Sequence, residues 1–341
     1  MHHTDVLIIG AGPAGLWAAF ELGLLQCSSQ VVDALPMVGG QVAQLYADKL
    51  IYDVPGSPPC TGEALVQRLH QQLHPLDVPI HLAQTIGRLT RDGEHLIVHS
   101  TAGQAWRCRA LLISAGVGAF APRRLRGLDF QALEGHSVHY HLTAAQGRSQ
   151  RCAVYGGGQQ ALSAAVLLAQ TSPHPVSLIY RRDVLQADAE TSAAFTRLRE
   201  AGRIRVLTGM IGGFVSHGHQ LMALDLNHPN ASTSRLQADQ LWVMEGLSNQ
   251  LGVIADWGLA MARKQVVVDP TTLATSEAGI YAVGDIAHYP NKRRLLLSAW
   301  HESTQAAYAI ADTLHPGGLG PQEYTSSSAR LQKKLGGLSQ N

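Results

Sequence analysis

The feature that most constrains this chain is a strand, a glycine-rich turn and a helix that occur twice in the same order, at residues 6–26 and 152–170. In the first copy, Val6–Ile9 runs into Gly10-Ala11-Gly12-Pro13-Ala14-Gly15. In the second, Cys152–Tyr155 runs into Gly156-Gly157-Gly158-Gln159-Gln160-Ala161. Small residues at these spacings permit a tight turn, close approach of a ligand to the backbone, and packing of the helix onto the strand. The repeat therefore predicts two similar units, each with a phosphate cradle at a helix N-terminus.

The rest of the chain fits an α/β class, because short apolar runs bounded by Gly and Pro alternate with stretches of helical period. We expect two Rossmann-like dinucleotide-binding domains of three-layer ββα/βα type. The predicted strands are 6–9, 30–32, 111–114, 152–155, 176–179, 204–207, 266–268 and 280–283. The predicted helices are 13–26, 61–73, 159–170 and 298–314.

Charge, hydropathy and cysteine spacing exclude several classes of protein. A net charge of +1 gives no reason to expect nucleic-acid binding. The apolar runs are shorter than the roughly 20 residues that span a bilayer, and no export leader precedes the first strand, so neither membrane insertion nor export is expected. The four cysteines are too widely spaced for a CxxC pair or a metal-ligand cluster, which predicts no metal site and buried thiols in a reducing cytoplasm.

The two units differ at the end of their second strand, and this difference predicts two different dinucleotides. Asp33 follows the strand at 30–32, where a carboxylate accepts hydrogen bonds from both ribose hydroxyls of an adenosine. Arg181 and Arg182 follow the strand at 176–179, where guanidinium groups match a 2′-phosphate. NADPH is therefore favoured over NADH at the second site. At the first site, the alternative interpretation is a glycine-rich turn of some other kind of α/β protein. At the second site, the alternative is that the two arginines are simply solvent-exposed residues at a strand end.

Beyond the two turns, further motifs carry a resemblance to a known family. These are Gly39-Gly40-Gln41, the stretch 45–53, the segment 115–122 beginning Ala115-Gly116-Val117-Gly118, and Ala282-Val283-Gly284-Asp285. Over nearly its whole length the chain resembles the thioredoxin-reductase-like flavoproteins, and within them the type 2 ferredoxin–NADP reductases. The resemblance implies an FAD domain at 1–116 and 246–315, an inserted NADPH domain at 117–245, and a tail at 316–341 that covers the flavin.

The resemblance also implies which residues touch each cofactor. Tyr46 and Tyr324 are expected on opposite faces of the flavin. The alternative is that Tyr324 belongs to a loosely ordered tail and does not contact the flavin. No other catalytic residue is expected, because hydride transfer at the flavin needs orientation and electrostatics rather than an acid–base pair. The expected FAD-binding residues are Gly10, Gly12, Pro13, Ala14, Gly15, Asp33, Gly40, Gln41, Tyr46, Ile86, Phe120, Gly284, Asp285 and Ser326. The expected NADP-binding residues are Gly156, Gly158, Gln159, Gln160, Arg181 and Arg182.

Thioredoxin reductases of this type carry a CxxC shortly before the second glycine turn, but residues 138–143 of this chain contain no cysteine. Electrons must then leave directly from the flavin, which implies a ferredoxin or flavodoxin partner and, as in relatives, a homodimer. The runs Lys292-Arg293-Arg294 and Arg123, Arg124, Arg126 are predicted docking patches, with ordinary solvated surface as the alternative.

A few positions depart from the family pattern. Trp300 and His301 stand where relatives usually have Phe-Gly, Tyr180 where histidine is usual, and Gln186 where arginine is common. We expect His301 to pack against the protein, with tuning of the flavin as the alternative. The leading hypothesis is an FAD-dependent ferredoxin–NADP reductase. The alternatives are an NADPH–flavin reductase with another small acceptor and a flavin- or nucleotide-binding sensor without useful turnover.

Overall fold

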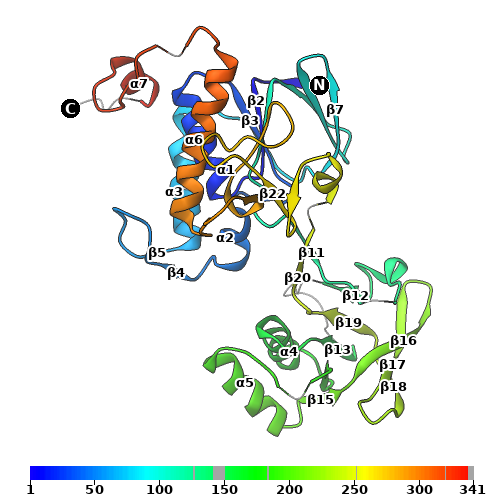
Figure 1. Cartoon of the computed structure of the whole chain (residues 1–341). Coiled ribbons are helices and arrows are strands. Elements are labelled where there is room, and N and C mark those ends of the chain that lie inside the picture. The colour runs from blue at the N-terminus through cyan, green and yellow to red at the C-terminus, as the bar shows by residue number, and fades with distance from the viewer. Residues whose placement is uncertain (126, 141–149, 183, 251, 319, 337–341) are drawn as a thin grey trace. The chain divides into compact units, whose positions relative to one another are not determined.

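Separate hydrophobic cores divide the chain into two units. The computed structural model describes residues 1–125, 127–140, 150–182, 184–250, 252–318 and 320–336 (Figure 1). The first unit contains Met1–Ala119 and Asn249–Asn341, and the second contains Phe120–Ser248. The chain passes between them through β11 (Ala119–Pro122) and β20 (Leu247–Gln250), which pair with each other.

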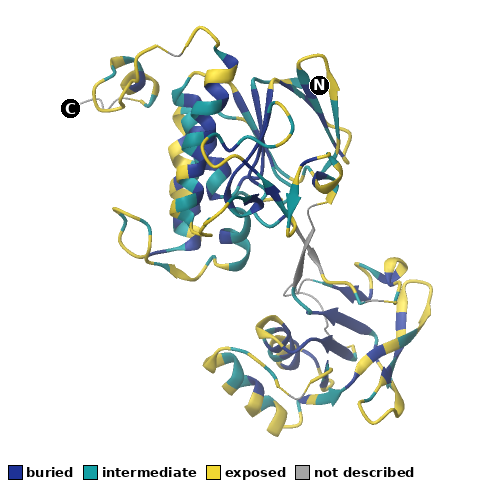
Figure 2. Ribbon diagram, viewed as in Figure 1, coloured by how far each residue is buried: buried dark blue, intermediate teal, exposed yellow. Residues whose placement is uncertain are grey.

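A five-stranded parallel sheet forms the centre of the first unit. Its strand order is β23 (Ile280–Ala282), β10 (Ala110–Ile113), β2 (Val6–Ile9), β3 (Ser29–Val32) and β6 (Ile80–His81). All four residues of β2 are buried, as expected for a parallel strand covered on both faces (Figure 2). Helices α1 (Pro13–Leu24), α3 (Gly62–Leu73) and α6 (Leu296–Leu314) lie along one side of this sheet (Figure 1).

A second sheet completes the first unit. Its order is β1 (His2–His3), β9 (Ala105–Cys108), β8 (His95–Ser100) and β7 (Ile86–Asp92), with antiparallel pairing except between β1 and β9. The unit therefore consists of a helical layer, a parallel sheet and an antiparallel sheet, which confirms the predicted ββα type. Smaller elements that matter below are α2 (Gly40–Leu45), the hairpin of β21 (Met261–Ala262) and β22 (Gln265–Val267), β24 (Ala287–His288) and α7 (Ala329–Lys334).

The second unit repeats this plan. Its parallel sheet has the order β12 (Val138–His139), β19 (Gln240–Val243), β13 (Cys152–Tyr155), β14 (Val176–Tyr180) and β15 (Ile204–Thr208). Alternate residues of β13 face two cores: Cys152 and Val154 pack with the helices, while Ala153 and Tyr155 pack with the antiparallel sheet. The helices are α4 (Gln159–Thr171) and α5 (Ala189–Glu200), and the antiparallel strands are β16 (Met210–His217), β17 (Gln220–Asn227) and β18 (Thr233–Gln237).

All eight predicted strands and all four predicted helices are present, and no end differs from its predicted position by more than two residues. Helix α1 ends at Leu24 rather than residue 26, because Gln26 adopts a left-handed conformation with φ 61°. Helix α6 begins at Leu296, two residues before the predicted start. No helix in the described ranges has both the length and the apolar character needed to cross a membrane.

Candidate functional site

The first glycine turn connects β2 to α1, and two of its glycines are required by close packing. Gly10 has φ +112°, and a Cβ there would lie 2.5 Å from the carbonyl oxygen of Ser114. A Cβ at Gly15 would lie 1.9 Å from the carbonyl oxygen of Gly10. Any larger side chain would push the helix away from the strand and its neighbour.

Gly12 differs from these two glycines, because apart from its own neighbours along the chain no described atom lies within 4 Å of the place its Cβ would take. Gly12 is the N-cap of α1 and offers no side-chain cap, and the first turn contains no acidic residue. The first amides of α1, apart from that of Pro13, which has no N–H, therefore face open space with the positive end of the helix dipole. This cradle fits a pyrophosphate.

Asp33 lies beside this turn, as its position after β3 predicts. One carboxylate oxygen accepts from the Ala11 amide at 2.6 Å and the other from the Leu35 amide at 2.8 Å. Burial raises the pKa of Asp33, and these two amides oppose the shift. Each oxygen can accept a second hydrogen bond, so the carboxylate can still receive the two hydroxyls of a ribose.

Two further motifs converge on the same turn. The Gly39 amide donates to the Ala11 carbonyl at 2.8 Å, and a Cβ at Gly40 would lie 3.2 Å from the Cα of Gly12. The amide nitrogen of the Gln41 side chain would lie 2.8 Å from a Cβ at Gly116, where φ is +61°. Segments 10–15, 39–41 and 115–118 thus form one surface of backbone and small residues in the first unit.

The Gly284–Asp285 loop approaches α1 from the end of β23. A Cβ at Gly284 would lie 3.5 Å from the Cβ of Ala14. The Asp285 side chain is half-buried, and its carboxylate makes no hydrogen bond to another described residue. It is free to receive the hydroxyl groups of a ligand.

A buried carboxylate that sequence reasoning missed holds this loop in place. Glu302 on α6 is 1% exposed, accepts from the Gly284 amide at 2.7 Å and from the Tyr289 hydroxyl at 2.7 Å, and forms an ion pair with Lys292. Burial and the hydrogen bond to Glu302 raise the pKa of Tyr289. The sequence does contain one indication of this role: Glu302 is a charged residue on the predicted inner face of the helix, between the apolar residues Ala299 and Ala306.

This ion pair corrects one prediction. The Lys292 side chain is only 7% exposed and is bound to Glu302, so Lys292 cannot serve in a docking patch with Arg293 and Arg294. In the other predicted patch, Arg124 pairs with Glu134 and lies over the ring of Tyr140, while residue 126 lies outside the described residues.

The α6 residues that depart from the family pattern have different surroundings. Trp300 donates to the Pro13 carbonyl at 3.2 Å and so connects α6 to the start of α1. His301 is exposed, which makes the expectation that it packs wrong. The helix turns it to the side opposite Ser303, which donates to the Ala14 carbonyl at 3.0 Å.

The residues expected around the flavin ring lie on separate elements, unlike the residues that meet at the glycine turn. Tyr46 directly follows α2 and is 50% exposed, and Ile86 begins β7. Phe120 is in β11, and its side chain lies outside the described part of the structure.

The tail packs on the end of α1 that is far from the glycine turn. Arg330 donates to the Leu24 carbonyl at 3.2 Å and Lys334 to the Gly23 carbonyl at 2.8 Å, whereas the turn is at the other end of this helix. Tyr324 is 60% exposed and Ser326 is also exposed. Within one chain, the tail therefore caps α1 and does not line the turn.

The second glycine turn connects β13 to α4 in the same way. Gly156 has φ +142°, and a Cβ there would lie 2.4 Å from the Met244 carbonyl oxygen. Gly158 is the N-cap of α4 and, like Gly12, has open space where a Cβ would be. Gly157 lies under the ring of Tyr180, with 2.2 Å between its hypothetical Cβ and ring carbon Cε1. This turn also fits a pyrophosphate.

The arginines expected to read a phosphate lie just past β14. Arg181 and Arg182 are exposed, and neither forms an ion pair or side-chain hydrogen bond with another described residue. The chain then returns to the turn, because the Gln186 amide donates to the Gly157 carbonyl at 2.9 Å. Two guanidinium groups without a bonding partner among the described residues thus accompany the second cradle, where the first cradle has a carboxylate.

The two glutamines after Gly158 do not behave alike. The Gln159 side chain accepts from the Asp188 amide at 2.7 Å and donates to the Asp188 carboxylate at 2.8 Å. Gln160 is exposed. Gln159 is therefore committed to holding the start of α5, while Gln160 remains open to a ligand.

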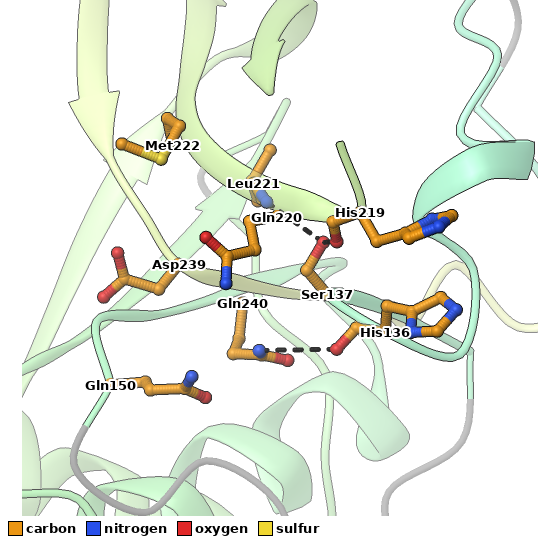
Figure 3. A pocket seen from close by; sticks show the side chains of 9 residues that line it. All are labelled: His136, Ser137, Gln150, His219, Gln220, Leu221, Met222, Asp239 and Gln240. Carbon is orange, nitrogen blue, oxygen red and sulfur yellow. Dashed lines mark hydrogen bonds between the residues drawn. The ribbon is translucent and has the colours of Figure 1, made fainter. Parts of the chain in front are cut away.

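A cavity of about 490 Å³ lies elsewhere in the second unit (Figure 3). The Ser137 hydroxyl donates to the His219 carbonyl at 2.9 Å and accepts from the Leu221 amide at 3.1 Å, while Asp239 is paired with Arg151. The lining of this cavity contains no residue of either glycine turn. The Ser137 hydroxyl and the Asp239 carboxylate already have hydrogen-bond partners within the protein. Across the described ranges, no group of three or more His, Cys, Asp or Glu residues is arranged to hold a metal ion.

Comparison with known proteins gives concordant results. Residues 4–311 match the family described as pyridine nucleotide-disulphide oxidoreductase. The ferredoxin–NADP reductase of Acidovorax sp. (strain JS42) is 45% identical over 339 residues, covering 98% of this chain and 95% of that protein. The ferredoxin–NADP reductase of Paracidovorax citrulli (strain AAC00-1) is 42% identical, with coverages of 98% and 96%.

Solved structures share the fold at lower identity. The thioredoxin reductase of Lactococcus lactis superposes with a TM-score of 0.64 at 20% identity, covering 91% of this chain and 99% of that one. The bacillithiol disulfide reductase Bdr of Staphylococcus aureus gives a TM-score of 0.66 at 15% identity, with coverages of 93% and 99%. At these identities the likeness concerns the fold alone.

Proposed function

Because this chain belongs to the pyridine nucleotide-disulphide oxidoreductase family and, within it, to the ferredoxin–NADP reductases, we propose that it exchanges electrons between NADPH and ferredoxin. It is an oxidoreductase of the FAD-dependent type that uses NADP(H). Bound FAD supplies the step between the partners, since a flavin takes two electrons together and releases them singly.

The observation that carries the proposal is the pair of matching glycine turns with opposite charges beside them. The turn with Asp33 suits FAD, whose ribose offers hydroxyl donors, and the turn with Arg181 and Arg182 suits the 2′-phosphate of NADP(H). Gln41 and Asp285 would complete the FAD site. The further FAD contacts expected above, including Tyr46, Ile86, Phe120, Tyr324 and Ser326, belong to the same proposal.

The thiol groups support an electron path that leaves directly from the flavin. All four cysteines are free and buried. Burial raises the pKa of Cys27 and Cys152 to about 11 and that of Cys108 to about 12, so little thiolate forms near neutral pH. Free, buried thiols also support the cytoplasmic location included in the proposal. Flavodoxin is a second acceptor with the same one-electron chemistry, and a homodimer stays a prediction.

The test is reduction of a purified ferredoxin by the FAD-loaded protein and NADPH, followed through cytochrome c. We expect cytochrome c reduction that depends on added ferredoxin. Equal rates with and without ferredoxin would favour an NADPH–flavin reductase. Protein that binds FAD but is not reduced by NADPH would favour a sensor and contradict the proposal.

A further inference from the structure

Four exposed cations from two segments lie together in the first unit. Arg263 and Lys264 form the turn between β21 and β22, with φ values of 49° and 66°. Strand β22 pairs with β24, and the chain that follows β24 carries Arg293 and Arg294. The Arg294 guanidinium donates to the Gln265 side-chain oxygen at 3.2 Å, which joins the two segments.

None of these four charges is neutralised by an acidic side chain of the described chain. Arg263, Lys264, Arg293 and Arg294 are all exposed, and none forms an ion pair with a described residue. Lys292, their neighbour, is different because Glu302 takes its charge in the interior. Since the whole chain has a net charge of only +1, the cluster is a local positive field.

The cluster is one side chain away from the proposed flavin site. Gln265, which accepts from Arg294, donates through its amide nitrogen to the Asp285 carbonyl at 2.7 Å and to the Ala287 carbonyl at 3.1 Å. Asp285 belongs to the loop that packs against the start of α1. A partner seated on these cations would therefore approach the end of the first unit where the Gly284–Asp285 loop lies.

Exposed apolar residues adjoin the charges. Leu295 and Leu297, which directly follow the arginines at the start of α6, are each 51% exposed. Apolar side chains beside a charged rim are typical of the surfaces at which two proteins associate transiently. The alternative, an ordinary solvent-exposed run of arginines, gives no reason for exposed leucines beside the charges.

We propose that Arg263, Lys264, Arg293 and Arg294, together with Leu295 and Leu297, form the docking surface for an acidic one-electron carrier protein. The inference rests on the proposed function and adds the place at which the carrier binds. Ferredoxins are typically acidic, so the charges of the two surfaces are complementary. The arginines and the lysine accelerate encounter, and the leucines lengthen the life of the complex.

The experiment compares two charge-reversed variants of the FAD-loaded protein. The surface variant carries Arg263→Glu, Lys264→Glu and Arg293→Glu and leaves Arg294 in place, because Arg294 bonds Gln265. The matched control carries Arg88→Glu, Arg197→Glu and Arg199→Glu, which are exposed residues outside the cluster. Both variants change the net charge equally. NADPH-driven reduction of menadione, a small uncharged quinone, needs no protein docking and is not steered by surface charge, so it reports the intact enzyme.

At low ionic strength, we expect kcat/KM for ferredoxin to fall roughly tenfold or more in the surface variant and to stay near the wild-type value in the control. The dependence of kcat/KM on salt should disappear in the surface variant and remain in the control. Menadione reduction should be unchanged in both. A Leu295→Ser, Leu297→Ser variant should weaken ferredoxin binding with the salt dependence retained. Equal losses in the surface and control variants, or none in either, would overturn the docking surface. A wild-type protein that reduces menadione but no ferredoxin would instead refute the proposed function.

Discussion

Single residues distinguish the two cradles more sharply than their backbones do. Gly12 and Gly158 both cap a helix and both leave open space in front of it. The difference between the sites lies at the end of the second strand, with Asp33 in one unit and Arg181 and Arg182 in the other. A carboxylate would repel a 2′-phosphate, whereas unpaired guanidinium groups attract it.

This difference predicts the coenzyme preference of an Arg181→Ser, Arg182→Ser variant. The dissociation constant for NADPH should rise roughly 100-fold, because two charge-assisted hydrogen bonds of about 1.5 kcal/mol each are lost. NADH, which has no 2′-phosphate, should be affected much less. Titration of both coenzymes measures the ratio, and Arg197→Ser, Arg199→Ser is the matched control. Equal weakening of NADPH and NADH would remove the assignment.

Glu302 gives a second prediction at this scale. A Glu302→Gln change keeps the shape of the side chain but leaves the Lys292 ammonium buried without a counter-charge. The free energy of unfolding should fall by about 3 kcal/mol. FAD should bind more weakly, because the single acceptor oxygen of the amide cannot serve the Gly284 amide, the Tyr289 hydroxyl and Lys292 together.

Thermal unfolding and a fluorescence titration of FAD measure the two effects of Glu302→Gln. Adding Lys292→Met to this variant should restore much of the stability, since no unpaired charge then remains in the interior. If the double variant is no more stable than the single one, the ion pair is not the cause.

At the scale of elements, α1 serves two purposes at its two ends. Its N-terminus faces the glycine turn, and its C-terminus receives Arg330 and Lys334 from the tail. Cations at the last carbonyls of a helix offset its dipole and fill unsatisfied acceptors. The tail is thus ordered by α1, with Leu331 of α7 only 2% exposed.

The tail allows its two suggested roles to be separated. Arg330→Ala should lower the free energy of unfolding by about 1 kcal/mol, because the Leu24 carbonyl loses its donor. Tyr324→Ala should leave stability nearly unchanged, since the ring is 60% exposed. The flavin absorbance spectrum then decides the second role: a shifted spectrum in Tyr324→Ala supports stacking, and an identical spectrum argues against it.

At the scale of the whole molecule, the fold is shared with disulfide reductases, whereas the CxxC pair of thioredoxin reductases is missing from the corresponding segment. Thioredoxin and bacillithiol disulfide reductases superpose on this chain at 20% and 15% identity. Residues 138–143 contain no cysteine, and each of the four thiols is buried in one or other unit. The structural likeness therefore extends to the dinucleotide-binding framework and stops before the redox-active dithiol.

The two strand–turn–helix units, the class of sheet and the contrast between Asp33 and the arginine pair follow from the amino-acid sequence without any structure. These are local patterns, since glycine spacing and apolar runs act within a few residues of one another. The individual strands of the two antiparallel sheets were not located, although most of them pair with the next strand along the chain, because the strand preference of half-exposed runs depends on their tertiary context.

The neighbours of each motif become known only from the three-dimensional fold. It placed Gln41 against Gly116, buried Lys292 on Glu302, joined Arg294 to Gln265 and set the tail on the end of α1. Each of these contacts joins segments whose proximity follows from how helices and sheets stack, and no pattern within either segment records it. The sequence around Lys292 would be the same whether its side chain faced water or a buried carboxylate, so the role of Lys292 depends on packing alone.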